Sequence, residues 1–315
     1  MLLRDYAITP DVFDTMSYSS QELCAVHLSH LKEVLLNEGL VRDLRAGEWS
    51  RLFADDARSW HPRGKELLKK LAQQNRLVGF QPHRPSSPSN DIEWCEEALG
   101  THGVLAFTGG IIVTESVKTA FPGNALVARI DRLASASWWA ARASSVRLRR
   151  DMRDYLDQLA PVLRCSNSLI FIDPHLDPSL NRYGQFGQLL WAAGGRTPAP
   201  TIEIHRVCFE GSGPNRTFPM SSDSAYFETR FRRALQTILS SAGLRAEVFI
   251  WDDFHDRYLI SDLIGISLPN GFDTTTDPNS VTTWTRLGRK DRDDVQREFD
   301  PASGRHTLRH RFTIP

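Results

Sequence analysis

The stretch AEVFIWDDFHDRYLISD, residues 246–262, decides the fold of the second half of the chain. It begins with an apolar run over residues 246–251, typical of a buried strand, and continues into a segment that holds His255, Arg257 and Asp262. Alternate side chains of an extended segment share a face, so we expect His255 and Arg257 to point the same way. An imidazole can attack phosphorus or protonate a leaving oxygen, and a guanidinium can neutralise nonbridging oxygens. The pattern therefore predicts a phosphate site in which Asp262 orients the imidazole.

The elements around this stretch predict a layered α/β domain. Two short apolar runs precede it, at residues 168–172 and 201–209, and a helical pattern covers residues 228–242. Residues 144–163 also show helical spacing, and Pro161 is expected to end or kink that helix. Strands that alternate with helices in this way form a sheet with helices packed on it. Residues 306–314 are expected to form a C-terminal strand, which argues against a metal-binding pair of His306 and His310.

The first part of the chain reads as a smaller, helix-rich α/β domain over residues 1–135, and the second domain covers residues 136–315. A helix is predicted over residues 19–39, with a capping box of Ser19 and Glu22 and an apolar face that includes Leu23 and Val26. Further helices are predicted over residues 65–74 and 91–99, and two short strands around a hairpin turn at Gly109-Gly110. We find no catalytic motif in this domain, and its role is left open.

Composition limits the function classes. The 315 residues are 41% hydrophobic and 24% charged, as in folded globular proteins, and 38 basic residues balance 38 acidic ones. Nucleic-acid binding would therefore have to be local, through Arg clusters at residues 147–153, 230–233 and 286–292, although solvated helix faces explain these equally well. No signal peptide or membrane span is predicted, and four widely spaced cysteines favour a reducing cytoplasm.

The motif resembles a known signature. His255-x-Arg257-x4-Asp262 is similar to the H-x-K-x4-D motif of the phospholipase D superfamily, with Arg in the Lys position. The segment GISLPNGFD supplies Ser267 and Asn270 in place of the polar residues that usually follow the motif, at a shifted spacing. The run FIDPHL, residues 171–176, resembles the "DPY" strand end of divergent, bacterial defence-associated members. The resemblance covers about residues 150–300.

The resemblance implies a phospholipase D-like domain and a phosphodiesterase, a nuclease in preference to a lipase, with a role in anti-phage defence. The family needs no metal or cofactor and uses two histidines, one of which forms a phosphohistidine. Because the chain shows one motif, the second imidazole is expected either from His255 of another copy in a homodimer or from His175 of the same chain. Asp173, His175, Ser267 and Asn270 are expected to bind the substrate.

Other readings stay open. The same pocket could serve a catalytically inactive phosphate-binding or scaffold subunit of a larger protein or nucleic-acid complex, or a lipid-headgroup sensor. Asp173, His175 and Asp177 could form a metal cluster, but each Asp precedes a proline, which favours turns at the rim of a pocket.

Overall fold

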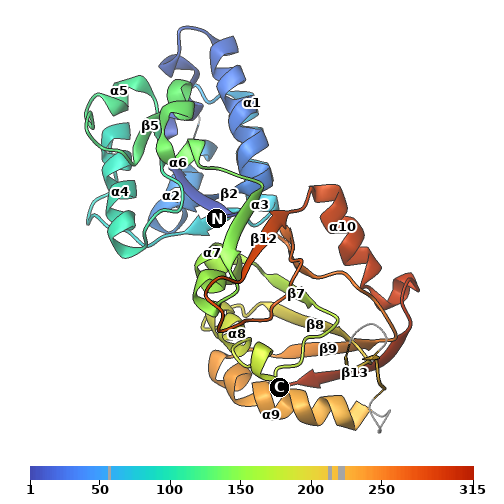
Figure 1. The fold of residues 1–315 in the computed structure, drawn as a ribbon. Helices are drawn as coiled ribbons and strands as arrows, with labels where there is room; N and C mark the ends of the chain where they lie inside the picture. Colours follow the sequence, from blue (N-terminus) through green and yellow to red (C-terminus); the bar gives the residue numbers. More distant parts are fainter. Residues whose placement is uncertain (56–57, 212–214, 219–223) are drawn as a thin grey trace. The chain divides into compact units, whose positions relative to one another are not determined.

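The computed structural model describes residues 1–55, 58–211, 215–218 and 224–315. Apart from its first two residues, the chain forms two compact units, Leu3–Ala143 and Ser144–Pro315 (Figure 1). The boundary predicted after residue 135 falls within the first unit, because Trp139 packs into that unit's core. Both units are α/β. In the part of the chain that the structure describes, no helix is long and apolar enough to cross a membrane.

The first unit is built on a five-stranded parallel sheet with the strand order β3-β2-β1-β4-β5. Its strands are short and mostly buried, as in sheets covered by helices on both faces. The strands are β1 Arg4–Ile8, β2 Gly39–Asp43, β3 Leu77–Gly79, β4 Ile111–Val113 and β5 Val127–Arg129. The helices are α1 Gln21–Glu38, α2 Leu44–Arg51, α3 Pro62–Gln73, α4 Asp91–Val104, α5 Glu115–Lys118 and α6 Ser137–Ala140.

The helix predicted over residues 19–39 is present, but its cap and its buried face differ from the prediction. Ser20, not Ser19, caps α1, because its hydroxyl accepts a hydrogen bond from the backbone N–H of Leu23. Leu23 and Val26 are 41% and 62% exposed. The buried face consists of Cys24, Leu28, Leu31 and Leu35.

The hairpin predicted at Gly109-Gly110 is wrong. Helix α4 extends to Val104, and β4 pairs with β1 in parallel, which no tight hairpin allows. The carbonyl of Gly110 accepts a hydrogen bond from Ala7, so the two glycines lead into β4 alongside β1. Glycine is needed there, because a Cβ at Gly109 would lie 2.6 Å from the carbonyl oxygen of Asp5.

The second unit contains an eight-stranded mixed sheet with the order β13-β9-β8-β7-β10-β11-β12-β6. The central strands β7, β8 and β9 pair in parallel, whereas β10 pairs antiparallel with β7 and β13 pairs antiparallel with β9. The strands are β6 Ser145–Arg149, β7 Ser168–Ile172, β8 Thr201–Val207, β9 Ala246–Trp251, β10 Tyr258–Ser261, β11 Gly265–Ser267, β12 Val281–Arg286 and β13 Leu308–Ile314. The helices are α7 Met152–Cys165, α8 Gly187–Ala193, α9 Ser224–Ala242 and α10 Arg289–Glu298.

Helices pack on both faces of this sheet. Phe171 of β7 contacts Phe186, directly before α8, and α8 packs between α7 and α9. Ile170, which points to the opposite face, belongs to a second apolar cluster with Val295 and Phe299 at α10. The structure confirms the layered α/β architecture, and Figure 1 shows α10 on one side of the strands and α8 and α9 on the other.

The helix predicted over residues 144–163 is wrong in its first part. Residues Ser145–Arg149 form β6, which pairs antiparallel with β12. Leu148 is buried while Arg147 and Arg149 are exposed, so this stretch has the two-residue period of a strand. Pro161 neither ends nor shortens α7, which continues to Cys165.

Candidate active site

Asp173, the first residue after β7, joins three segments of the second unit. Its side chain is fully buried, and its Oδ1 accepts the backbone N–H of His175 at 2.9 Å. Its Oδ2 accepts the hydroxyl of Tyr183 and the backbone N–H of Phe272, both at 3.1 Å. Burial raises the pKa of this carboxyl despite these donors and the nearby Arg257. Asp173 therefore holds the chain after β7 against the loop that contains Phe272.

The turns after β7 are those predicted from the Asp-Pro pairs. The carboxylate of Asp177 accepts the N–H of Ser179 at 3.0 Å, as Asp173 does for His175. Asp177 is buried and forms ion pairs with Arg206 and Arg230 at 3.3 and 2.7 Å. Among the described residues, no group of three or more His, Cys, Asp or Glu side chains is placed to hold a metal ion.

A pocket of about 260 Å³ opens beside Asp173. His175 and two arginines line it, together with polar and small residues from the loops after β8 and β11. We call it the His175 pocket; its lining residues are His175, Arg182, Tyr183, Gly211, Arg257, Pro269, Asn270 and Asp273.

Arg257 lies at the inner wall of this pocket. Its Nε is 3.7 Å from Asp173 Oδ1, and its Nη1 is 3.4 Å from the carbonyl oxygens of His255 and Pro269. These contacts are long for hydrogen bonds, so the donors of the guanidinium remain available to a stronger acceptor. The side chain is 27% exposed, which leaves part of it open to the pocket.

The imidazole of His175 has a pKa well below that of a free histidine. Burial and four arginines lower its pKa from 6.5 to about 4; the arginines are Arg257, Arg182, Arg206 and Arg216. His175 is therefore neutral at pH 7, with a ring nitrogen lone pair in an electropositive pocket. A neutral imidazole can act as a nucleophile or as a general base.

His255 occupies a different environment from the predicted one. Strand β9 ends at Trp251 and β10 begins at Tyr258, so His255 and Arg257 lie in the loop between the strands and do not alternate along one. The His255 side chain is 76% exposed; its Nδ1 is 3.3 Å from Arg216, and its Nε2 is 4.0 Å from Asp253. His255 is not among the residues that line the pocket.

Asp262 and Ser267 also lie outside the pocket lining. Asp262 follows β10, and its Oδ1 accepts the N–H groups of Asn167 and Ser168 at the start of β7. Asp262 lies five residues after Arg257, at the other end of β10, which is about 17 Å at the rise of a strand. Asp262 therefore cannot orient His255. Ser267 lies in β11, paired with Tyr258.

The structure thus joins His175, Asn270 and Arg257 around one pocket with Asp173 behind it, and leaves out His255, Asp262 and Ser267. Sequence reasoning missed Arg182, Tyr183 and Asp273. Arg182 and Tyr183 follow the turns after β7 closely, which was the only available signal for them.

The predicted basic clusters do not converge on the pocket. Arg149 pairs with Asp151 and Asp154, and Arg292 pairs with Asp293. Two arginines of these clusters lie near the pocket, and each forms ion pairs with acidic residues there. Arg150 pairs with the lining residue Asp273, and Arg230 pairs with Asp177 and Glu210.

Comparison with known proteins gives no family. No family model matches the chain, and no curated protein matches it. Among solved structures, the chain is similar to Nuc from Salmonella typhimurium, a phospholipase D family member, with 11% identity and a TM-score of 0.33. That match covers 52% of this chain and 97% of Nuc. A second similar structure is TrmBL2, an archaeal chromatin protein that binds DNA, with 11% identity, a TM-score of 0.30, and coverage of 90% and 94% of the two chains.

Proposed function

We propose that the His175 pocket binds the phosphoryl group of a phosphodiester and that the second unit is a phosphodiesterase in which His175 takes the role expected of His255. The observation that carries this proposal is the convergence of His175, Arg182 and Arg257 on one pocket of about 260 Å³.

The electrostatics of the pocket suit a phosphate anion. Arg182 and Arg257 can contact nonbridging oxygens, where a planar guanidinium offers two parallel donors. Asn270 adds a side chain with both donors and an acceptor. Arg206 and Arg216 add positive potential at His175.

A single imidazole suffices for a balanced hydrolysis. His175 takes a proton from a water molecule as the water oxygen attacks phosphorus, and returns that proton to the leaving oxygen as its bond to phosphorus breaks. The anionic substrate offsets the charge of the arginines, which raises the pKa of His175 toward the range useful for this exchange. The alternative is direct attack by His175 to form a phosphohistidine, with the second imidazole supplied by another copy of the chain.

The substrate is proposed to be a short or terminal phosphodiester. The pocket is small, and the Arg clusters of the second unit are dispersed in ion pairs with neighbouring acids. A nuclease would therefore engage an end or a flipped-out nucleotide, without the wide basic surface that tracks a long duplex. A role in anti-phage defence rests on the motif resemblance alone, and a cytoplasmic location rests on the wide spacing of the four cysteines.

The test is hydrolysis of bis(4-nitrophenyl) phosphate and of short labelled oligonucleotides by the full chain in excess EDTA. We expect turnover that His175→Ala abolishes and His255→Ala retains, since only the first side chain lines the pocket. The two variants form a matched pair. Loss of turnover in His255→Ala with retention in His175→Ala would instead favour the two-subunit arrangement of His255 and refute this assignment.

A second candidate function is phosphate recognition without turnover, as in a scaffold subunit. It is favoured by the fact that a single histidine lines the pocket. Here a nonhydrolysable phosphorothioate oligonucleotide would bind the wild-type chain and bind Arg257→Ala weakly, while neither protein would form product from the natural phosphodiester.

A further inference from the structure

Asp273 brings a negative charge to the wall of the His175 pocket. Among the described residues that line this pocket, it is the only acidic one, and the two positively charged ones are Arg182 and Arg257. A carboxylate is an unusual neighbour for a bound phosphate anion, because like charges repel each other. Its presence therefore restricts which phosphate anions the pocket accepts.

The backbone around Asp273 is fixed by hydrogen bonds on both sides. The carbonyl oxygen of Asp273 accepts the hydroxyl of Tyr155 at 2.9 Å, and the N–H of the preceding residue donates to the buried carboxylate of Asp173. The next residue, Thr274, donates its N–H to the carbonyl oxygen of Arg182 at 2.7 Å. Asp273 is thus held beside Arg182, and the loop cannot move away from the pocket without breaking these bonds.

The carboxylate of Asp273 is compensated on one side. Arg150 donates its Nη2 to Oδ2 at 2.6 Å, whereas the buried Oδ1 accepts no hydrogen bond from the part of the chain that the structure describes. The charge of Asp273 is felt inside the pocket. Burial is the main cause that raises the pKa of Tyr183, and the charges of Asp173 and Asp273 raise it further, against the opposing effect of Arg182.

The charges of the lining match a singly charged anion. Two guanidinium groups and one carboxylate leave one net positive charge, which equals in magnitude the single negative charge of a phosphodiester. A phosphomonoester has a second pKa of about 6 and carries nearly two negative charges above pH 7. Its additional charge is attracted by the arginines and repelled by Asp273.

We propose that Asp273 is a specificity-determining residue, which makes the His175 pocket select singly charged phosphodiesters against doubly charged phosphomonoesters. This inference rests on the proposed function, since it concerns the same pocket. Asp273 supplies the repulsive element of the site, because Arg182 and Arg257 alone would favour the anion of higher charge.

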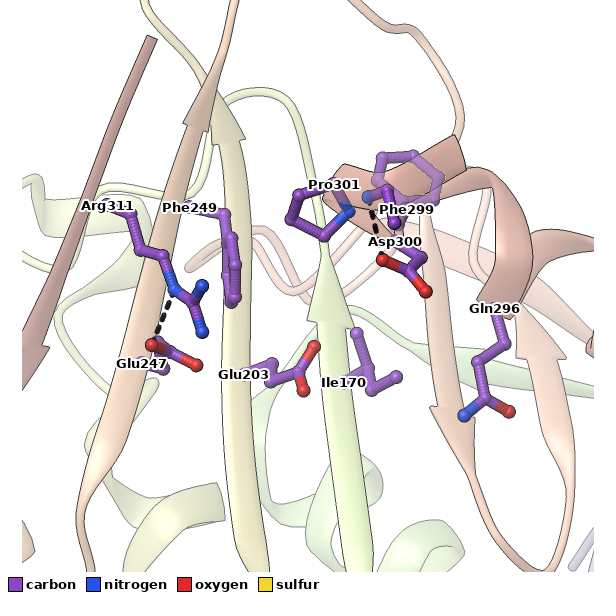
Figure 2. A pocket seen from close by; sticks show the side chains of 10 residues that line it. Ile170, Glu203, Glu247, Phe249, Gln296, Phe299, Asp300, Pro301 and Arg311 are labelled. Carbon is purple, nitrogen blue, oxygen red and sulfur yellow. Dashed lines mark hydrogen bonds and ion pairs between the residues drawn. The ribbon is translucent and has the colours of Figure 1, made fainter. Parts of the chain in front are cut away.

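A larger groove of the second unit disfavours both kinds of anion. It has a volume of about 440 Å³ and lies over strands β7, β8, β9 and β13. Figure 2 shows Glu203, Glu247 and Asp300 in its lining, with Arg311 paired to Glu247. Arg311 also interacts electrostatically with Glu203, so the described lining offers three carboxylates and a guanidinium that already faces two of them. A phosphate ester is therefore not expected to bind in this groove.

The test is NMR titration of the full chain at about pH 8 with methyl phosphate, which is then doubly charged, and dimethyl phosphate, which is singly charged. We expect the wild type to bind dimethyl phosphate at least as tightly as methyl phosphate, despite its lower charge. Asp273→Asn removes the negative charge at nearly constant shape. It is expected to raise the affinity for methyl phosphate relative to dimethyl phosphate about tenfold or more, because one repulsive charge is lost beside the anion.

Two further variants fix the direction of the effect. Arg150→Gln removes the ion pair of Asp273 and is expected to shift the ratio of the two affinities the opposite way, toward dimethyl phosphate. Asp157→Asn is the control, because Asp157 is exposed and does not line the pocket, and its ratio should equal that of the wild type. Thermal melts show that each variant is folded.

The outcomes separate this inference from the function on which it rests. If both esters bind and their affinity ratio is the same in Asp273→Asn as in the wild type, the role of Asp273 is overturned and the phosphate site stands. A wild-type preference for methyl phosphate would also overturn that role. If neither ester binds to the wild type or to Asp273→Asn, the proposed phosphate site fails, and the role of Asp273 fails with it.

Discussion

The carboxylate of Asp173 lies against the backbone of Gly271, so close that a Cβ at Gly271 would stand 1.9 Å from Asp173 Oδ2. Gly271 also has a positive φ of 64°, which side chains disfavour. Its N–H donates to Leu268 at 2.7 Å and closes the turn that presents Asn270 to the pocket. The contact between Asp173 and Gly271 therefore fixes the loop after β11 to the end of β7.

Gly271→Ala is expected to destabilise the second unit and to weaken phosphate binding. The backbone strain alone costs about 1 to 3 kcal/mol, and the clash with Asp173 adds to it. Urea unfolding measures the stability, and titration with inorganic phosphate measures the pocket.

Gly243→Ala is the matched control for this substitution. Gly243 has a similar φ of 67°, but a Cβ there would meet nothing within 4 Å. Gly243→Ala should therefore lower the free energy of unfolding only by the backbone strain, about 1 to 3 kcal/mol, and leave the phosphate affinity unchanged. Equal losses of phosphate affinity in both variants would contradict the role given to the contact with Asp173.

Arg257→Ala is expected to weaken the binding of inorganic phosphate about tenfold or more, because a charge-assisted hydrogen bond contributes about 1.5 to 3 kcal/mol. The phosphate affinity of Arg257→Lys should lie between those of Arg257→Ala and the wild type, since lysine keeps the charge and loses the planar donor pair. Arg245→Ala is the control, because Arg245 is exposed and precedes β9 at the end of the strand opposite to the loop of Arg257. Affinities from calorimetry that agree for all four proteins would exclude Arg257 from the site.

Much of the second unit could be predicted because its central strands are continuous apolar runs. Residues 168–172 and 246–251 form β7 and β9 as predicted, and the second candidate strand forms as Thr201–Val207. The Asp-Pro turns could also be predicted from neighbouring residues, since each Asp carboxylate accepts a hydrogen bond from the N–H two residues later. Such features depend on neighbours in the sequence.

The composition of the pocket depends on contacts that no local pattern reveals. Asp173 bonds Tyr183 and Phe272, which are 10 and 99 residues away. The spacing of His255, Arg257 and Asp262 suggested one extended segment, but the chain leaves the sheet after Trp251 and re-enters it at Tyr258. That break places His255 in an exposed loop and Asp262 at the far end of the next strand.

Asp262→Ala is expected to lower stability and to leave phosphate binding intact. Its carboxylate accepts two backbone N–H groups at the start of β7, and loss of these bonds costs about 1 to 3 kcal/mol. Asp173→Asn should lower both the stability and the phosphate affinity, because its buried carboxylate accepts three hydrogen bonds and also backs the pocket. Urea midpoints and phosphate titrations on both variants check this pair, and a loss of phosphate affinity in Asp262→Ala would return that residue to the site.

The protonation of His175 gives a pH-dependent signature. Its pKa in the folded chain is about 4, below the ordinary value of 6.5, so between these values the unfolded chain binds more protons than the folded chain. The free energy of unfolding should therefore rise as the pH increases from 4 to 6.5, and the contribution of His175 should be complete above that range. His175→Gln should flatten this part of the profile, whereas the exposed His255→Gln should not.

Phosphate should shift the same titration in a predictable direction. A bound anion screens Arg182 and Arg257 from the imidazole, so the pKa of His175 rises in its presence. By linkage, phosphate must then bind more tightly when His175 is protonated, and its affinity should increase as the pH falls toward the pKa. NMR titration of the histidine ring protons with and without phosphate measures both effects. A His175 resonance that titrates near 6.5 in the free protein and does not move with phosphate would show that the imidazole faces solvent and not the guanidinium groups of the pocket.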